Sequence, residues 1–208
     1  PHHPDTHCLR IVRLIMPQIS PDTLMPLEVY AKARPEFRAK VIAHKKDRTL
    51  QLGENLTLIF EDELTIRYQV QEMLRIEKGG AEQIPGELAA YNPLIPQGDE
   101  LIATLMLEIE DEKRRSATLL TLGGIEESVF LEIGADTIKA TPTEYDDRTT
   151  PDGKTSSVHW LRLKLHADQI ARFTSGSERL VLGLSHRKYG HMAVLGAETR
   201  SALAKDFA

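Results

Sequence analysis

The sequence predicts an α+β protein in which a mostly antiparallel sheet, built from hairpins, is covered by helices. Three observations support this class. Several segments carry apolar residues at helical spacing, and several short segments with strand-like patterns are joined by tight Gly-containing turns. The composition is also ordinary for a globular protein, with 41% hydrophobic and 27% charged residues. Its 208 residues suffice for one sizeable core, so we expect a single domain.

The first residues of the chain are expected to lie outside this domain. Residues 1–16 resemble neither a signal peptide nor a strong amphipathic helix. We therefore interpret 1–16 as a disordered tail or an expression remnant and 17–208 as the α+β domain.

The first helical region contains a proline that is expected to divide it. Residues 20–22 (SPD) form a helix-start signal, and Pro35 suits the first turn of a second helix. On that second helix, Phe37, Val41 and His44 share one face, so His44 is expected to point inward. Segments 49–52 and 56–61 then flank a three-residue loop and predict a hairpin.

The remaining pattern alternates helices and strands. A helix is expected over 64–78, with Ile66 and Val70 on its main apolar face and Glu72 within a lesser apolar stripe. The strand over 155–165 places His159 on its apolar face. The other expected elements are a helix at 86–91, a strand at 101–110, a charged helix from 111, a hairpin at 129–133 and 137–140, a helix at 167–173, strands at 180–186 and after 190, and a terminal helix at 197–207.

Several function classes are disfavoured by composition and motifs. A net charge of −5 argues against a general nucleic-acid binder. The apolar runs fall far short of the roughly 20 residues that cross a bilayer. Phosphate-binding loops and dinucleotide fingerprints are missing from the sequence, so no nucleotide cofactor is expected. Cys8 is the only cysteine, which favours a reducing, cytoplasmic compartment.

Three ionisable residues on apparently buried faces form the candidate site. Two imidazoles and a carboxylate, from His44, His159 and Glu72, suit iron, manganese or zinc with open coordination positions. Tyr68 and Arg75 lie near Glu72 on the same helix and would support the ligands. The alternative is that both histidines are hydrogen-bonded core residues, and that Glu72 pairs with Arg75 or with an arginine of the first helices.

A local basic cluster precedes the first hairpin, and it could hold an anion or an acidic partner. A solvated helix face is the alternative interpretation. Its members are Arg34, Arg38, Lys45, Lys46 and Arg48.

Four separated blocks resemble a bacterial family known as domain of unknown function 3501. They are EVYAKARPEFRAKVIAHKK, LIFEDELTIRYQVQEMLRIE, ELAAYNPLIP and KTSSVHWLRLKL, within a match from about residue 19 to near the C-terminus. The resemblance implies no assigned activity. It does imply a setting beside a rubrerythrin-like protein and an iron–sulfur oxidoreductase, and hence redox or peroxide-related work. The blocks contain the candidate ligands, and they add Glu61 and Gln71 to the residues expected around them.

Two functions from different classes remain open at this point. The first is a metal-binding, redox-associated protein, which could be an oxidoreductase component in peroxide or oxidative-stress handling. In it, His44, Glu72 and His159 hold iron, manganese or zinc, with haem iron a lesser alternative. The second is a non-catalytic accessory protein that docks onto an iron–sulfur oxidoreductase or rubrerythrin-like partner through the basic cluster. In that case the buried polar residues are structural.

Overall fold

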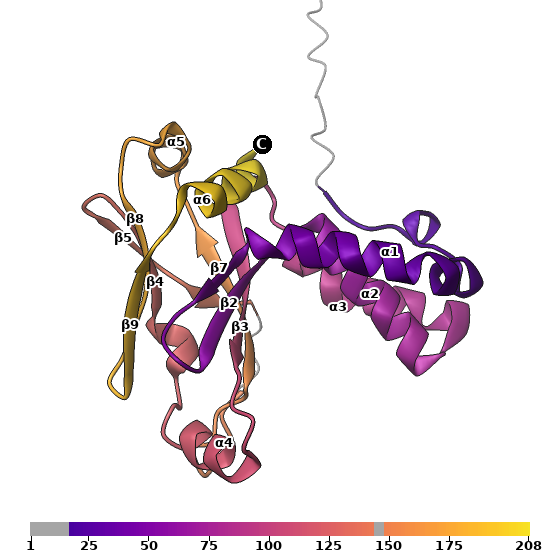
Figure 1. Cartoon of the computed structure of the whole chain (residues 1–208), viewed down its shortest axis with the longest axis horizontal. Helices are drawn as coiled ribbons and strands as arrows, with labels where there is room; N and C mark the ends of the chain where they lie inside the picture. Colours follow the sequence, from indigo (N-terminus) through magenta and orange to yellow (C-terminus); the bar gives the residue numbers. More distant parts are fainter. Residues whose placement is uncertain (1–16, 144–147) are drawn as a thin grey trace, which may run out of the picture.

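The computed structural model describes residues 17–143 and 148–208, so the expected tail over 1–16 lies outside the described residues. Two antiparallel sheets face each other (Figure 1). The first sheet has the order β1-β2-β3-β7-β6, and the second has the order β5-β4-β8-β9. The α+β class and the antiparallel pairing are therefore confirmed, but the strands form two sheets where one was expected.

Three strand pairs are tight hairpins, and the other pairs join strands that are connected through longer segments of the chain. The first sheet contains β1 (Thr49–Gln51), β2 (Leu56–Glu61), β3 (Glu100–Leu107), β6 (Thr141–Pro142) and β7 (Val158–Lys164). The second contains β4 (Val129–Ile133), β5 (Asp136–Lys139), β8 (Leu180–His186) and β9 (Tyr189–Val194). Both predicted hairpins, β1-β2 and β4-β5, are present.

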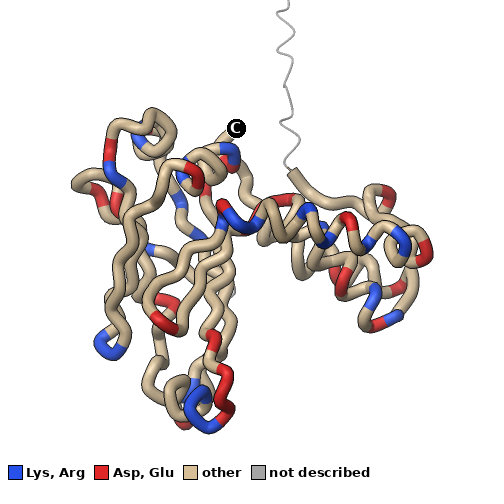
Figure 2. Tube along the Cα trace, viewed as in Figure 1, with Lys and Arg blue, Asp and Glu red and all other residues tan. Residues whose placement is uncertain are grey.

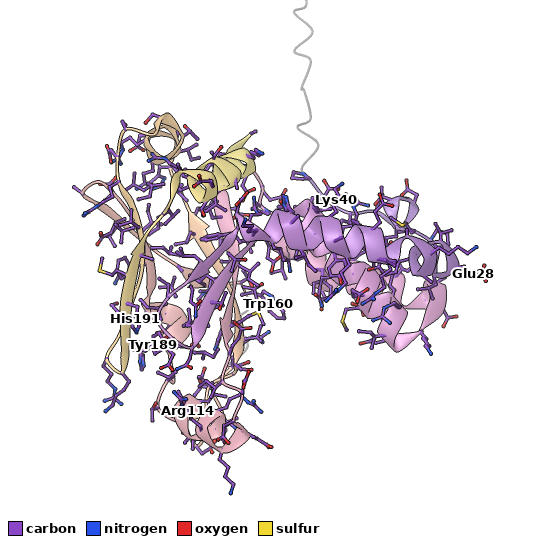
Figure 3. The ribbon with its side chains drawn as sticks, in the orientation of Figure 1. Glu28, Lys40, Arg114, Trp160, Tyr189 and His191 are labelled. Atoms are coloured by element: carbon purple, nitrogen blue, oxygen red, sulfur yellow. The ribbon has the colours of Figure 1, made fainter. Side chains whose placement is uncertain are left out.

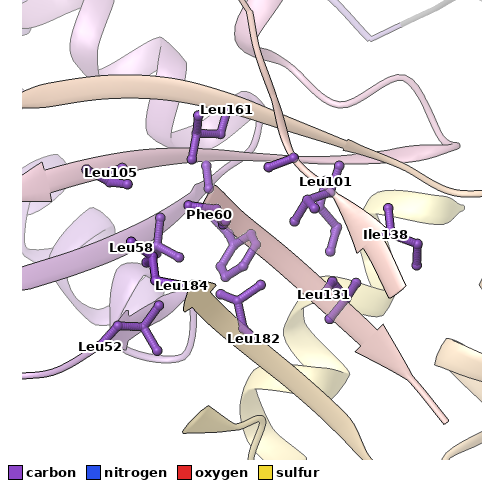
Figure 4. Packing of buried hydrophobic residues seen from close by; sticks show 14 of the residues in the cluster. Leu52, Leu58, Phe60, Leu101, Leu105, Leu131, Ile138, Leu161, Leu182 and Leu184 are labelled. Carbon is purple, nitrogen blue, oxygen red and sulfur yellow. The ribbon is translucent and has the colours of Figure 1, made fainter. Parts of the chain in front are cut away.

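The main hydrophobic core lies between the two sheets. Phe60, Leu105 and Leu161 of the first sheet meet Leu131 and Leu182 of the second sheet in one buried cluster (Figure 4). Strand alternation explains the arrangement, because every second residue of each strand points to the same face.

A second, smaller core lies on the other face of the first sheet. Helices α2 (Glu63–Glu77) and α3 (Ile84–Tyr91) contribute to it, and α1 (Leu27–Lys46) packs on α2. Ile66 and Val70 of α2 pack in one cluster with Ile102 of β3. These helices project away from the sheets (Figure 1), and we call them the helical arm.

Helix α1 is continuous through Pro35, so the expected division into two helices is wrong. A proline inside a helix removes one backbone hydrogen bond and costs several kcal/mol in isolation. Here Tyr30 and Val41, on either side of Pro35, are both buried. Packing of these residues holds the two halves in line, with Pro35 itself on the exposed side.

Short helical segments complete the chain. They are η1 (Pro21–Thr23), η2 (Gly80–Glu82), η3 (Asn92–Leu94), α4 (Glu112–Leu119), η4 (Ile125–Ser128), α5 (Ala167–Ser175), α6 (Ala197–Leu203) and η5 (Ala204–Phe207). Segment η5 lies near β3 and α5, so the end of the chain returns to the sheets.

Candidate functional site

The three residues predicted as metal ligands lie in three separate hydrogen-bond networks. His44 contacts Asp62, Glu72 contacts arginines and a tyrosine, and His159 contacts Thr155 and the Ser156 carbonyl. The structure therefore does not bring the three side chains together. Among residues 17–143 and 148–208, no group of three or more His, Cys, Asp or Glu side chains is arranged to hold a metal ion. Metal binding at these residues stays a prediction without a shared site to support it.

The first sheet separates His159 from the helix that carries Glu72. His159 pairs across the strands with Leu105, whose side chain lies in the core between the sheets. Helix α2 packs on the opposite face, against Ile102. Residues an odd number of positions apart on a strand point to opposite faces, so Leu105 and Ile102 mark the two sides. His159 therefore faces the core between the sheets, whereas Glu72 faces α1.

Glu72 anchors the packing of α1 on α2. Its carboxylate accepts hydrogen bonds from Tyr30 Oη at 2.7 Å and from Nε and Nη2 of Arg34, each at 2.8 Å. Arg75 adds contacts at 3.3 and 3.2 Å. The Arg34 guanidinium is the main cause that lowers the pKa of Glu72 to about 2. Glu72 is thus a fully paired anion, as the structural alternative predicted.

The residues expected to support Glu72 have other roles, except Arg75. The Tyr68 ring packs edge-on against Phe37, with 5.8 Å between ring centroids. Gln71 is buried and accepts a hydrogen bond from the Met25 backbone at 2.7 Å. Glu61 accepts one from Thr104 at 2.6 Å. The first contact lies within the helical arm, the second joins α2 to the segment before α1, and the third lies within the first sheet.

His159 is a buried core histidine. Its Nε2 lies 3.0 Å from the carbonyl of Ser156 and 3.1 Å from the hydroxyl of Thr155. The carbonyl can only accept, so Nε2 carries the proton. Its Nδ1 lies 3.8 Å from Glu126 Oε2. Burial lowers the pKa of His159 despite that carboxylate, so the neutral imidazole is favoured.

His44 belongs to a network that the sequence did not predict. Its Nε2 lies 2.5 Å from Oδ2 of Asp62, whose other oxygen caps α2 by accepting from the Thr65 backbone. Arg48, only 1% exposed, lies 3.6 Å from Asp62 and 2.5 Å from Asp206. The same guanidinium donates to the carbonyls of Phe60, Glu61 and Ala202. We call His44, Arg48, Asp62 and Asp206 the Arg48 network.

One buried guanidinium faces two carboxylates in this network. Burial opposes ionisation of Asp62, but Arg48, the Thr65 amide and His44 together lower its pKa below the usual value. For Asp206 burial prevails and raises the pKa to about 6, although Arg48 acts in the opposite direction. Asp62 was foreseeable as a helix cap before Thr65, whereas Asp206 carries no local signal.

The Arg48 network forms one wall of a cavity of about 790 Å³. The other walls come from the N-terminal turn of α2, the segment 95–99 before β3, and η5. The cavity therefore lies where the helical arm, the first sheet and the end of the chain meet. Cavities of this size at such junctions are common ligand sites.

The predicted basic cluster is divided between the surface and the interior. Arg48 is buried in its network and Arg34 is bound by Glu72, so neither is available as a surface contact. Arg38 and Lys46 are exposed on α1, and Lys45 is partly buried. The correction follows from the packing of α1, whose inner face carries Arg34 toward α2.

Two facing antiparallel sheets with a helical arm on one outer face define the class of α+β protein to which this chain belongs. The chain is a member of the family described as protein of unknown function (DUF3501), whose model matches residues 18–207. The resemblance seen in the sequence is therefore confirmed. No curated protein matches the chain.

The fold resembles that of a solved protein from Burkholderia pseudomallei. That crystal structure, described as a novel protein of unknown function, is 41% identical and covers 92% of this chain and 100% of its own, with a TM-score of 0.84. None of the described helices combines the length and apolar character needed to cross a membrane.

Proposed function

We propose that the protein is a non-catalytic accessory protein that docks onto an acidic surface of a partner protein through the outer face of α1. The main observation in support of this proposal is that little of this helix is buried. It has 20 residues, of which only Tyr30 and Val41 are buried. Its inner face packs on α2, while the opposite side faces away from the arm (Figure 1).

The charge of α1 is opposite to that of the whole protein. The helix holds six Lys or Arg residues against two Glu, a net charge of +4, whereas the chain carries −5. Figure 2 shows these basic positions spread along α1. Lys32, Arg38 and Lys46 are exposed and distributed over the length of the helix. Complementary charge of this kind favours encounter with an acidic partner surface.

Apolar side chains lie among these charges. Val29 is 51% exposed and Ile42 is 55% exposed, both on α1. An interface typically combines an apolar centre with a polar rim. The outer face of α1 offers both components. In this proposal, the buried polar residues behind it stabilise the packing of the helix.

The family context suggests which partner to test. An iron–sulfur oxidoreductase or a rubrerythrin-like protein would place the complex in cytoplasmic redox or peroxide metabolism. The single cysteine, Cys8, agrees with a reducing compartment. A metal-binding role for the chain itself has less support, because His44, Glu72 and His159 each have separate partners.

Calorimetric titration of the purified protein with each purified candidate partner tests this proposal. We expect binding that weakens as salt rises. The variant Lys32→Glu/Arg38→Glu/Lys46→Glu should lose at least about ten-fold in affinity, equivalent to about 1.4 kcal/mol.

A matched control reverses three exposed charges elsewhere. Lys113, Arg187 and Lys188 lie outside the helical arm and are exposed. Their joint change to Glu alters net charge equally, so it should leave specific docking nearly intact. Equal losses in both variants, or no binding of either partner, would contradict docking through α1.

A further inference from the structure

We propose that the cavity beside the Arg48 network binds a small amphipathic organic anion, with its charged group at Lys40 and Lys205 and its apolar body against the opposite wall. This site is distinct from the outer face of α1. Its volume of about 790 Å³ lies within the range of about 300–1,000 Å³ that small-molecule sites occupy.

Four basic side chains and four carboxylates line the cavity, but their pairing leaves two ammonium groups without a partner. Every side-chain carboxylate in the lining has a basic partner in the structure. The pairs are Asp62 with His44 and Arg48, Asp206 with Arg48, Glu63 with Arg67, and Asp99 with Lys164. Lys40 and Lys205 also line the cavity and form no ion pair with another described residue. An anion would supply the negatively charged partner that these two ammonium groups lack.

The geometry of α1 places Lys40 and His44 on one wall of the cavity. Lys40 and His44 are four residues apart, so they lie one turn apart on the same face of the helix. Figure 3 labels Lys40 on α1. Nε2 of His44 donates to Asp62, and Nδ1 forms no hydrogen bond with the described residues. Nδ1 of the neutral ring can only accept a hydrogen bond, so the two lysines hold the anion and His44 reports its presence beside them.

Apart from Gln97, the remaining side chains of the lining are apolar, so an inorganic ion would fill the site poorly. Leu64 from the first turn of α2, Ile95 and Pro96 before β3, and Phe207 from η5 contribute to it. Burying an alkyl chain or ring against these groups stabilises a complex in proportion to the apolar area removed from water. A ligand with both an anionic group and an apolar body uses both kinds of wall.

Calorimetry with octanoate, octanol and inorganic phosphate tests the proposal. Octanoate combines the two features, whereas octanol lacks the charge and phosphate lacks the apolar body. We expect saturable binding of one octanoate per chain, at least about ten-fold tighter than either comparator. The His44 imidazole resonances should shift with the same saturation curve. Absence of saturable octanoate binding, or equal affinity for octanol or phosphate, would overturn the proposal.

Paired variants locate the binding. Lys40→Gln/Lys205→Gln should weaken octanoate binding about ten-fold, while the control Lys113→Gln/Lys188→Gln should leave it unchanged. All four lysines are exposed, so neither double variant removes core packing. Equal affinity in the two double variants would place octanoate elsewhere and contradict the site. Docking through α1 can fail or succeed independently, because its test changes Lys32, Arg38 and Lys46.

Discussion

Nη2 of Arg48 lies 2.5 Å from Oδ2 of Asp206, although 158 residues separate the two in the chain. The same guanidinium donates to Phe60 and Glu61 of β2. Arg48 lies two residues after the end of α1, and Asp206 lies in η5. A single side chain therefore links the helical arm, the first sheet and the end of the chain.

Replacing Arg48 by Met should lower the free energy of unfolding by about 3–5 kcal/mol, because it leaves the Asp206 carboxylate and several carbonyls buried without a donor. Chemical denaturation monitored by circular dichroism measures the loss. The control Arg38→Met, on the exposed side of α1, should stay within about 0.5 kcal/mol of wild type. A loss below about 1 kcal/mol for Arg48→Met would show that the network contributes little.

The Asp206→Asn variant should gain stability relative to wild type as pH rises from about 4 to 7. Folding raises the pKa of Asp206 from 3.8 to about 6, so the native state favours the protonated carboxyl. That contribution is complete below pH 3.8 and is lost as pH rises through about 6. Asn cannot ionise and avoids the loss, which amounts to about 1–3 kcal/mol. Unfolding of the wild type and the variant, measured across this pH range, tests the prediction. A stability difference between them that does not change with pH would contradict the raised pKa of Asp206.

Glu72→Gln should show the opposite pH dependence. Folding lowers the pKa of Glu72 from 4.5 to about 2, so its stabilising effect is present above pH 4.5 and is lost as pH falls through about 2. The variant should be less stable than wild type at pH 7, and the gap should narrow below pH 4.5. Glu36→Gln, at an exposed position of α1, serves as the control. If the stability difference between Glu72→Gln and wild type stays constant on acidification, Glu72 is not a paired anion in the native state.

Local patterns predicted most of the elements but not how they meet. The hairpins β1-β2 and β4-β5 follow from turn residues within a few positions, and α2 follows from the spacing of Ile66 and Val70. Periodicity identifies the buried face of an element, but it does not identify which core that face enters. His159 and Glu72 were placed in one site for this reason, although the first sheet lies between them.

The Arg48 network could be predicted only in part. Asp62 could be recognised as a helix cap, because Thr65 follows three residues later. The partners of Arg48 depend on contacts across most of the chain, and a charged residue after a helix normally indicates a solvated position. Burial of Arg48 was therefore not expected, and its assignment to a surface cluster was wrong.

Elemental analysis of the purified protein and of three single variants tests the remaining metal hypothesis. Because His44, Glu72 and His159 occupy separate networks, changing each to Ala should leave iron, manganese and zinc content unchanged. Each change should instead lower stability, by about 1–3 kcal/mol for the histidines. Loss of one equivalent of the same metal in all three variants would show that they share an ion.

Lysine footprinting of the complex with the iron–sulfur oxidoreductase or rubrerythrin-like partner tests docking through α1 most directly. Acetylation followed by mass spectrometry reports the accessibility of each lysine with and without the partner. We predict that Lys32 and Lys46 on α1 become protected, while Lys113 and Lys188, both exposed elsewhere, react equally in both samples. Protection of Lys113 or Lys188 with unchanged labelling of Lys32 and Lys46 would contradict the proposed interface.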